Sequence, residues 1–167
     1  MRNLLFIILI VVVLSGCSNF QSEEKAVANA VDKAKEIFQD ETPVNVNYEA
    51  EDFSLYVPKR FDINSADEHN VILQDGDQKY IVFYNELEDS RSKLHYNEAK
   101  TIGTLAFEAF EDEGKFGYIR IMPDEGEGYE IQVGIGGVKI TTLTKKGNME
   151  KDAEEMMNIA KSIVANS

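Results

Sequence analysis

The spacing of apolar residues changes twice along this chain, and that change limits the fold more than any other feature. Between Ser22 and Phe38 the apolar residues recur every three or four positions, which is the period of an amphipathic helix. Ser22 suits the N-cap of this helix, two glutamates follow it, and Pro43 prevents the helix from extending much further. The apolar face of the helix consists of Val27, Ala30, Val31, Ala34, Ile37 and Phe38.

A period of two, which is typical of strands, dominates the next hundred residues or so. Asp75-Gly76 lies between two strand-like runs and therefore predicts a β-hairpin over residues 71–85. Residues 86–103 have weak periodicity, and we predict a loop there with a short helical turn. We expect further strands at 44–48, 53–57, 61–63, 104–112, 115–123, 128–135 and 138–144.

The helical period returns after Gly147-Asn148, where Asn148 suits an N-cap. The order helix, strands, helix predicts an α+β fold. We expect an antiparallel β-sheet of about six to seven strands, packed with an N-terminal and a C-terminal helix. The apolar face of the last helix consists of Met149, Ala153, Met156, Met157, Ala160, Ile163 and Val164.

An apolar run, Leu4–Leu14, precedes all of these elements. It is about half of the 20 or so residues that a membrane-spanning helix needs. Arg2 precedes the run and the small residues Ser15 and Gly16 follow it, which is the organisation of a secretory signal peptide.

The residues Leu14-Ser15-Gly16-Cys17 resemble the lipobox of bacterial lipoproteins. That resemblance implies cleavage between Gly16 and Cys17 and attachment of diacylglycerol, with chains such as palmitate, to the Cys17 thiol. It implies an anchor in the cell membrane, with the protein on the extracytoplasmic face. Cys17 is the only cysteine, so no disulfide or catalytic thiol would remain. The expected organisation is signal peptide 1–16, lipidated cysteine and tether 17–22, and a single domain 23–167.

Three segments of the chain together resemble the PsbP-like fold. They are FSLYVPKRFDI at 53–63, YEIQVGIGGVKITTLT at 129–144 and IAKSIV at 159–164. Phe61 stands where many such domains have tryptophan. The chain also resembles small lipoproteins of unknown function from Gram-positive bacteria. These resemblances imply a fold and a location and no activity.

The charge of the chain excludes one class of partner. The sequence holds 17 basic and 30 acidic residues, a net charge of −13, and removal of Arg2 with the signal would make it more negative. Nucleic-acid binding needs a basic surface, so we expect no nucleic-acid partner. The negative charge is typical of a soluble extracytoplasmic domain.

The sequence offers no recognisable catalytic or metal-binding constellation. His69 and His95 lack the spacing of a metal pair, and we interpret both as surface residues. Gly136-Gly137 lies between strand-like runs and indicates a hairpin turn instead of a phosphate loop. We therefore predict no enzyme activity, no cofactor and no metal centre. Three acidic turns, at 75–77, 111–113 and 124–127, leave open weak calcium binding at one of them.

One segment leans basic in this acidic chain, and it contains Arg91, Lys93, His95 and Lys100. Leu94 and Tyr96 are interleaved with the basic residues. The segment is either a partner surface formed by Arg91, Lys93, His95 and Tyr96 or a lid with Leu94 and Tyr96 buried on the sheet, and we prefer the lid.

The prediction for the whole chain is a membrane-anchored, non-enzymatic binding or assembly module with a protein partner in the cell envelope. The alternative is a small-ligand or cation-binding accessory lipoprotein of a transporter. A hydrolase of envelope polymers has no catalytic residues to support it.

Overall fold

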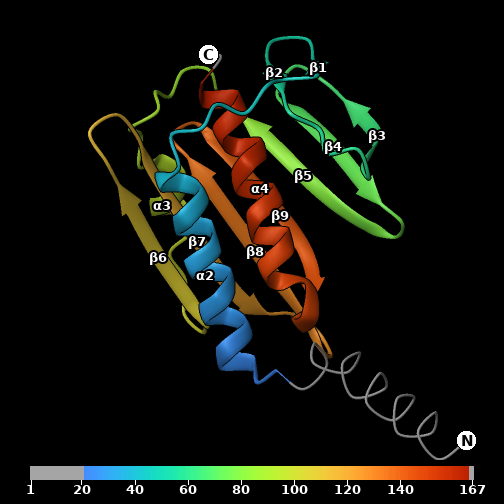
Figure 1. Ribbon diagram of the computed structural model, residues 1–167, viewed down its shortest axis with the longest axis vertical. Coiled ribbons are helices and arrows are strands. Elements are labelled where there is room, and N and C mark those ends of the chain that lie inside the picture. The colour runs from blue at the N-terminus through green and yellow to red at the C-terminus, as the bar shows by residue number, and fades with distance from the viewer. Residues whose placement is uncertain (1–20, 166–167) are drawn as a thin grey trace, which may run out of the picture.

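A computed structural model describes residues 21–165 and contains a seven-stranded antiparallel sheet with helices on both sides (Figure 1). The predicted α+β class is therefore confirmed. The strand order across the sheet is β3-β4-β5-β9-β8-β7-β6, and β1 and β2 form a separate two-stranded sheet. The strands are β1 (Tyr48–Glu49), β2 (Ser54–Leu55), β3 (Asp62–Ala66), β4 (Asn70–Asp75), β5 (Gln78–Tyr84), β6 (Ala106–Glu111), β7 (Phe116–Pro123), β8 (Gly128–Ile135) and β9 (Val138–Lys145).

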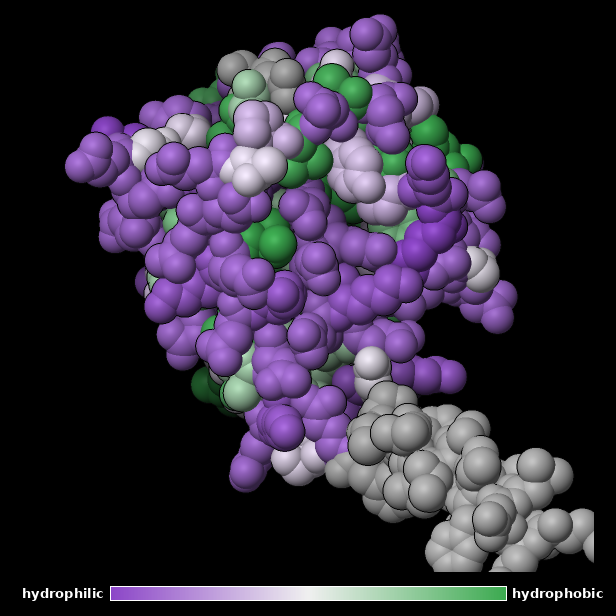
Figure 2. Space-filling view, in the orientation of Figure 1, coloured by the Kyte–Doolittle hydropathy of each residue, from purple (hydrophilic) through white to green (hydrophobic). Residues whose placement is uncertain are grey.

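Two long helices cover one face of the sheet (Figure 1). They are α2 (Glu23–Gln39) and α4 (Met149–Val164), and the second follows a short 3-10 turn, η1 (Lys146–Asn148). Their outward surface is largely hydrophilic in Figure 2. The predicted cap is present in α2, where the Ser22 hydroxyl accepts a hydrogen bond from the Lys25 N–H at 3.3 Å. Asn148 occupies the N-cap position of α4 without a side-chain capping hydrogen bond, because η1 precedes it.

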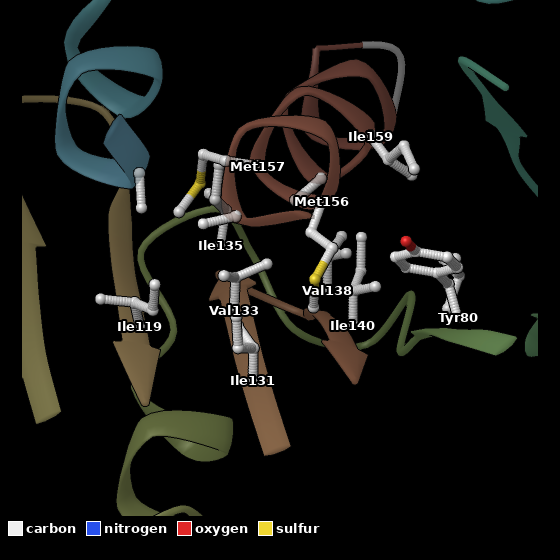
Figure 3. Close-up of a cluster of buried hydrophobic side chains, with 14 of the residues drawn as sticks. Tyr80, Ile119, Ile131, Val133, Ile135, Val138, Ile140, Met156, Met157 and Ile159 are labelled. Carbon is white, nitrogen blue, oxygen red and sulfur yellow. The ribbon is translucent and has the colours of Figure 1, made fainter. Parts of the chain in front are cut away.

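The hydrophobic core lies between these helices and the sheet. Ala30 and Ala34 of α2 are completely buried, and such small side chains let the helix approach its neighbours closely. Figure 3 shows Met156 and Met157 of α4 pointing toward valine and isoleucine side chains of the strands. All these side chains belong to one cluster, which supports the expected core role of the α4 methionines.

The hairpins follow the turn residues that the sequence indicates. Gly76 has a φ of 59° between β4 and β5, and Gly136 has a φ of 53° between β8 and β9, so both adopt a conformation that favours glycine. The predicted hairpin over 71–85 and the turn at Gly136-Gly137 are thus confirmed. No phosphate loop forms there, since Gly136 simply joins two paired strands.

The first two predicted strands are wrong in length. Residues 44–48 contribute only Tyr48 to a strand, and 53–57 contribute only two residues. The Asn47 side chain explains this, because its amide bonds both the N–H and the carbonyl of Val57, at 2.7 and 2.9 Å. A side chain thereby takes the place of a longer backbone ladder. The strand expected at 61–63 is shifted to β3.

The predicted signal peptide and Cys17 lie outside the described residues, so their proposed roles stay predictions. Among residues 21–165, no helix has both the length and the apolar character needed to cross a bilayer.

Candidate functional site

The short helix α3 (Leu94–Glu98) lies on the face of the sheet opposite α2 and α4, which we call the α3 face, and the segment 86–103 that contains α3 crosses this face (Figure 1). His95 is the anchor of this segment and is only 3 % exposed. Its Nε2 lies 3.2 Å from the carbonyl of Gly137 and its ring packs edge-on against Phe83, while Nδ1 lies 3.2 Å from a Glu98 oxygen. The interpretation of His95 as a surface residue is therefore wrong.

His69, in contrast, is exposed in the turn between β3 and β4, as predicted. Both histidines nevertheless lie near the same ring, because each makes an edge-to-face contact with Phe83, with ring centroids 6.5 Å apart for His69 and 5.5 Å apart for His95.

Tyr96 supplies the second attachment of the segment 86–103. Its ring stacks on Phe107 at 4.7 Å and meets the edges of Phe116 and Tyr118 at 5.2 and 5.9 Å. Burial in this aromatic group raises the pKa of Tyr118 above the usual range of a phenol. The lid prediction therefore agrees with the structure only in part, since Tyr96 packs on the sheet and is half-buried, whereas Leu94 remains exposed.

The lysines of the segment remain outside and lie over the same aromatic rings. The Nζ atoms of Lys93 and Lys100 are 4.6 and 5.0 Å from the centroids of Phe116 and Tyr96. Lys93 also pairs with Glu111 at 3.1 Å. Of the four residues predicted to form a partner surface, the structure therefore exposes Arg91 and Lys93, half-buries Tyr96 and buries His95.

Two glycines of the β8–β9 turn allow the segment to approach the sheet. A Cβ added to Gly136 would lie 2.3 Å from the carbonyl of Asp89, and one added to Gly137 would lie 2.4 Å from the carbonyl of Asn85. Sequence reasoning assigned these glycines to a turn and missed this second role. Two adjacent glycines, where the turn itself requires only one positive φ, were the available signal.

Backbone hydrogen bonds complete the attachment. The Phe116 N–H donates to the Ser90 carbonyl at 2.9 Å, and the Asn85 N–H donates to the Gly137 carbonyl at the same distance. At the other end of α3, the Arg120 guanidinium donates to the Ala99 carbonyl at 3.1 Å. The segment 86–103 is therefore held in place by buried groups along most of its length.

This well-anchored segment nevertheless exposes large apolar side chains. Leu87 is 86 % exposed and Ile102 is 93 % exposed, more than any other large apolar residue of the described chain. Two further apolar residues, Ile81 and Leu143, point outward from the same α3 face and are about half exposed. Exposed apolar groups on a rigid support are typical of a binding surface.

A second feature, a hollow of about 980 Å³, lies at the end of the sheet where α4 begins. It brings together two of the predicted acidic turns, since Asp75 and Asp77 line one side and Glu127 lines another. The acidic turns 111–113 and 124–127 lie at opposite ends of β7, as expected. Within residues 21–165, no three His, Cys, Asp or Glu side chains are grouped to hold a metal ion.

A third feature is a buried carboxylate, Asp152 in the first turn of α4, which is 2 % exposed. It accepts hydrogen bonds from Tyr80, Gln78 and Thr144 at 2.7, 2.9 and 2.5 Å. Burial, followed by the bond to Asp152, raises the pKa of Tyr80 above its usual range.

Arg60 lies on the solvent side of the buried Asp152 carboxylate. Its guanidinium lies 3.5 Å from Asp152 and pairs with Asp75 and Glu155. The cluster links the β4–β5 hairpin to α4, and its polar groups satisfy one another. It is therefore a structural connection, and it offers no free group for catalysis.

Comparison with known proteins gives no functional lead. No protein-family model matches this chain, and no curated protein matches it.

Proposed function

We propose that this protein is a membrane-anchored extracytoplasmic lipoprotein that acts as a non-enzymatic binding or assembly module. Its partner surface would be the α3 face of the sheet, opposite α2 and α4, together with the segment 86–103. The observation that carries the proposal is the contrast between firm attachment through His95 and the nearly complete exposure of Leu87 and Ile102. An apolar group that is merely flexible could fold away, whereas these two are held outward by a fixed backbone.

The anchor is the second part of the proposal. The tetrapeptide ending at Cys17 supports lipidation at the cysteine thiol, and two acyl chains give stable membrane attachment, because each buried methylene contributes about 0.8 kcal/mol. The helix–sheet–helix order also supports the proposed relationship to the PsbP-like fold. Mass spectrometry of the mature protein tests the anchor: we expect an N-terminal Cys17 that carries diacylglycerol. A different N-terminus or a free thiol would refute it.

The partner surface is tested by cross-linking and affinity capture from native membranes. The wild type is compared with Leu87→Ser and Ile102→Ser, both at exposed sites where the fold should be unaffected. Ile63→Ser is the matched control, because Ile63 is also exposed but lies on β3 at the far edge of the sheet. We expect the first two variants to lose a partner that the control retains. Equal recovery by all four proteins would contradict the proposed surface.

A second candidate function, small-ligand or cation binding, is favoured by the hollow of about 980 Å³. Its acidic turns and the nearby Lys145 could together hold a polar ligand. Calorimetric titration with Ca²⁺ tests the cation form of this idea, with Asp77→Asn and Glu127→Gln as variants. Heat that disappears in these variants would support it, and the absence of saturable heat in the wild type would dismiss calcium.

A further inference from the structure

The two edges of the seven-stranded sheet differ in their capacity to pair with another strand. At one edge, β3 has a register shift between Ile63 and Ser65, and such irregularities discourage pairing. At the other edge, β6 pairs with β7 in unbroken register from Ala106 to Glu111. Among the described residues, no strand pairs with the outer edge of β6, which forms the left margin of the sheet in Figure 1.

An apolar groove lies directly beside this regular edge, between α2 and the start of β6. Its volume is about 390 Å³, and its floor is formed by Val27, Ala28 and Val31 of α2 with Leu105 and Ala106. Figure 2 shows the corresponding hydrophobic patch at the lower left, surrounded by hydrophilic side chains. A strand added to β6 would place every second side chain over this groove.

The rim of the groove is entirely acidic. It consists of Glu23, Glu24, Asp32 and Glu108, and no basic residue lines the groove. Glu23 accepts a hydrogen bond from Tyr129 at 2.8 Å, whereas the other three carboxylates form no ion pair within residues 21–165. The groove therefore suits an apolar side chain that is flanked by basic ones.

We propose that β6 and this groove together bind an extended segment of a partner protein by strand addition. The segment would pair its backbone with the outer edge of β6, place apolar side chains in the groove, and place lysine or arginine side chains against the rim. No residue of the segment 86–103 lines the groove, although that segment contacts β6 through Tyr96 on Phe107.

A second copy of the chain is a poorer occupant of the same edge. Two β6 strands that paired edge to edge would bring Glu108 and Glu111 of each copy together, and each copy carries a net charge of −13. Charged side chains on an edge strand are a known barrier to self-association. The same negative charge attracts a basic partner.

The experiment uses the full chain in neutral detergent and a fluorescent probe peptide, Lys-Thr-Val-Thr-Val-Thr-Lys, with blocked ends. When the peptide is extended, its lysines and valines share one face. Binding is measured by fluorescence anisotropy, and hydrogen exchange of the β6 amides locates the bound peptide. We expect saturable binding, added protection on β6, and weaker binding at higher salt concentration.

Two control peptides separate strand addition from simple charge attraction. In the first, glutamate replaces both lysines, and in the second, N-methyl groups remove the backbone donors that would face β6. We expect neither control to bind. Equal binding of the N-methylated peptide would overturn the proposal, because a non-specific ionic contact does not need those donors.

Protein variants locate the site. The double variant Asp32→Lys with Glu108→Lys should weaken binding about tenfold, since two attractive contacts become repulsive. Ala28→Phe, at an exposed position on the groove floor, should block the groove without disturbing the core. Glu68→Lys, exposed in the β3–β4 turn, is the charge control that matches the single variant Glu108→Lys, and it should bind as the wild type does.

Three further results would refute the inference. They are no saturable binding by the wild type, an equal effect of Glu68→Lys, and sedimentation of the wild type as a dimer with β6 protected in the absence of peptide. The last result would assign the edge to a second copy of this chain.

Discussion

The buried carboxylate of Asp152 provides the most quantitative test of how this fold is held together. In Asp152→Ala, the hydroxyls of Tyr80 and Thr144 and the amide of Gln78 lose a shared acceptor that is only 2 % exposed. Each orphaned polar group costs about 1–3 kcal/mol, but Thr144 and Gln78 retain other partners. We expect the free energy of unfolding to fall by about 2–4 kcal/mol, because Tyr80 loses its acceptor while Arg60 keeps its pairs with Asp75 and Glu155.

The isosteric variant separates charge and hydrogen bonding from shape. Asp152→Asn retains one acceptor oxygen for Tyr80. Its new amide N–H group, however, replaces the oxygen that accepts from the Gln78 amide at 2.9 Å in the wild type, so two donors face each other. The expected loss is about 2 kcal/mol, which lies between that of the alanine variant and zero. Asp77→Asn is the matched control, because Asp77 is exposed, and its effect should stay within about 0.5 kcal/mol.

Urea unfolding is the appropriate assay, monitored by circular dichroism and by tyrosine fluorescence, because the chain has seven tyrosines and no tryptophan. A double-mutant cycle with Tyr80→Phe adds a further constraint. Once the Tyr80 hydroxyl has been removed, Asp152→Ala leaves one fewer polar group without a partner. The double variant should therefore lose about 1–2 kcal/mol less stability than the sum of the two single variants. Strict additivity, or an Asp152→Ala loss below about 1 kcal/mol, would refute the reasoning.

Three further predictions concern other parts of the fold. Gly136→Ala should lower the free energy of unfolding by about 1–3 kcal/mol and accelerate tryptic cleavage within the segment 86–103, because φ is positive there and the new Cβ would lie 2.3 Å from the Asp89 carbonyl. Gly147→Ala is the control and should have neither effect, since the space around Gly147 is open. The N–H groups of His69 and Asn70 donate to Asp67 and hold the pKa of its carboxyl below the ordinary 3.8. The wild type should therefore be more stable than Asp67→Asn above about pH 4, and this difference should vanish as the pH falls and the carboxyl becomes protonated. A difference in urea unfolding that does not change with pH would contradict this. Lys115→Met should lower the free energy of unfolding by about 0.5–1 kcal/mol, because the Lys115 ammonium donates to the Phe38 carbonyl in the last turn of α2 at 2.7 Å. An unchanged melting temperature would contradict that role.

The parts of the fold that the sequence predicted correctly are those set by local interactions. The apolar period of α2 and its Ser22 cap lie within a few residues of one another, as do Asp75 and Gly76 in the β4–β5 turn. Such signals require no knowledge of the rest of the chain. The length of β1 could not be predicted in this way, because the Asn47 amide bonds a backbone ten residues away.

The candidate site depends on long-range contacts, and the sequence predicted it only in part. His95 meets the carbonyl of Gly137, 42 residues further along, and nothing near His95 in the sequence indicates that partner. The pairing of β5 with β9 is equally remote, yet it decides that Ile81 and Leu143 share one face. The groove between α2 and β6 likewise arises from segments about 75 residues apart, so its acidic rim was visible in the sequence only as scattered glutamates.

The proposed anchor and the two proposed surfaces together imply an orientation at the membrane. Glu23, at the start of α2, is bonded to Tyr129 at the start of β8, so the chain enters the fold at that end of the sheet. A tether from Cys17 to Ser22 reaches at most about 20 Å, which keeps this end, and the groove beside it, close to the lipid. The far end of β8, where Gly137 meets the segment 86–103, lies about 23 Å further out. Leu87, near that turn, would therefore face partners in the envelope away from the membrane. The β6 edge would be within reach of extended, basic segments that lie close to the membrane surface, where positively charged chains gather near anionic lipids.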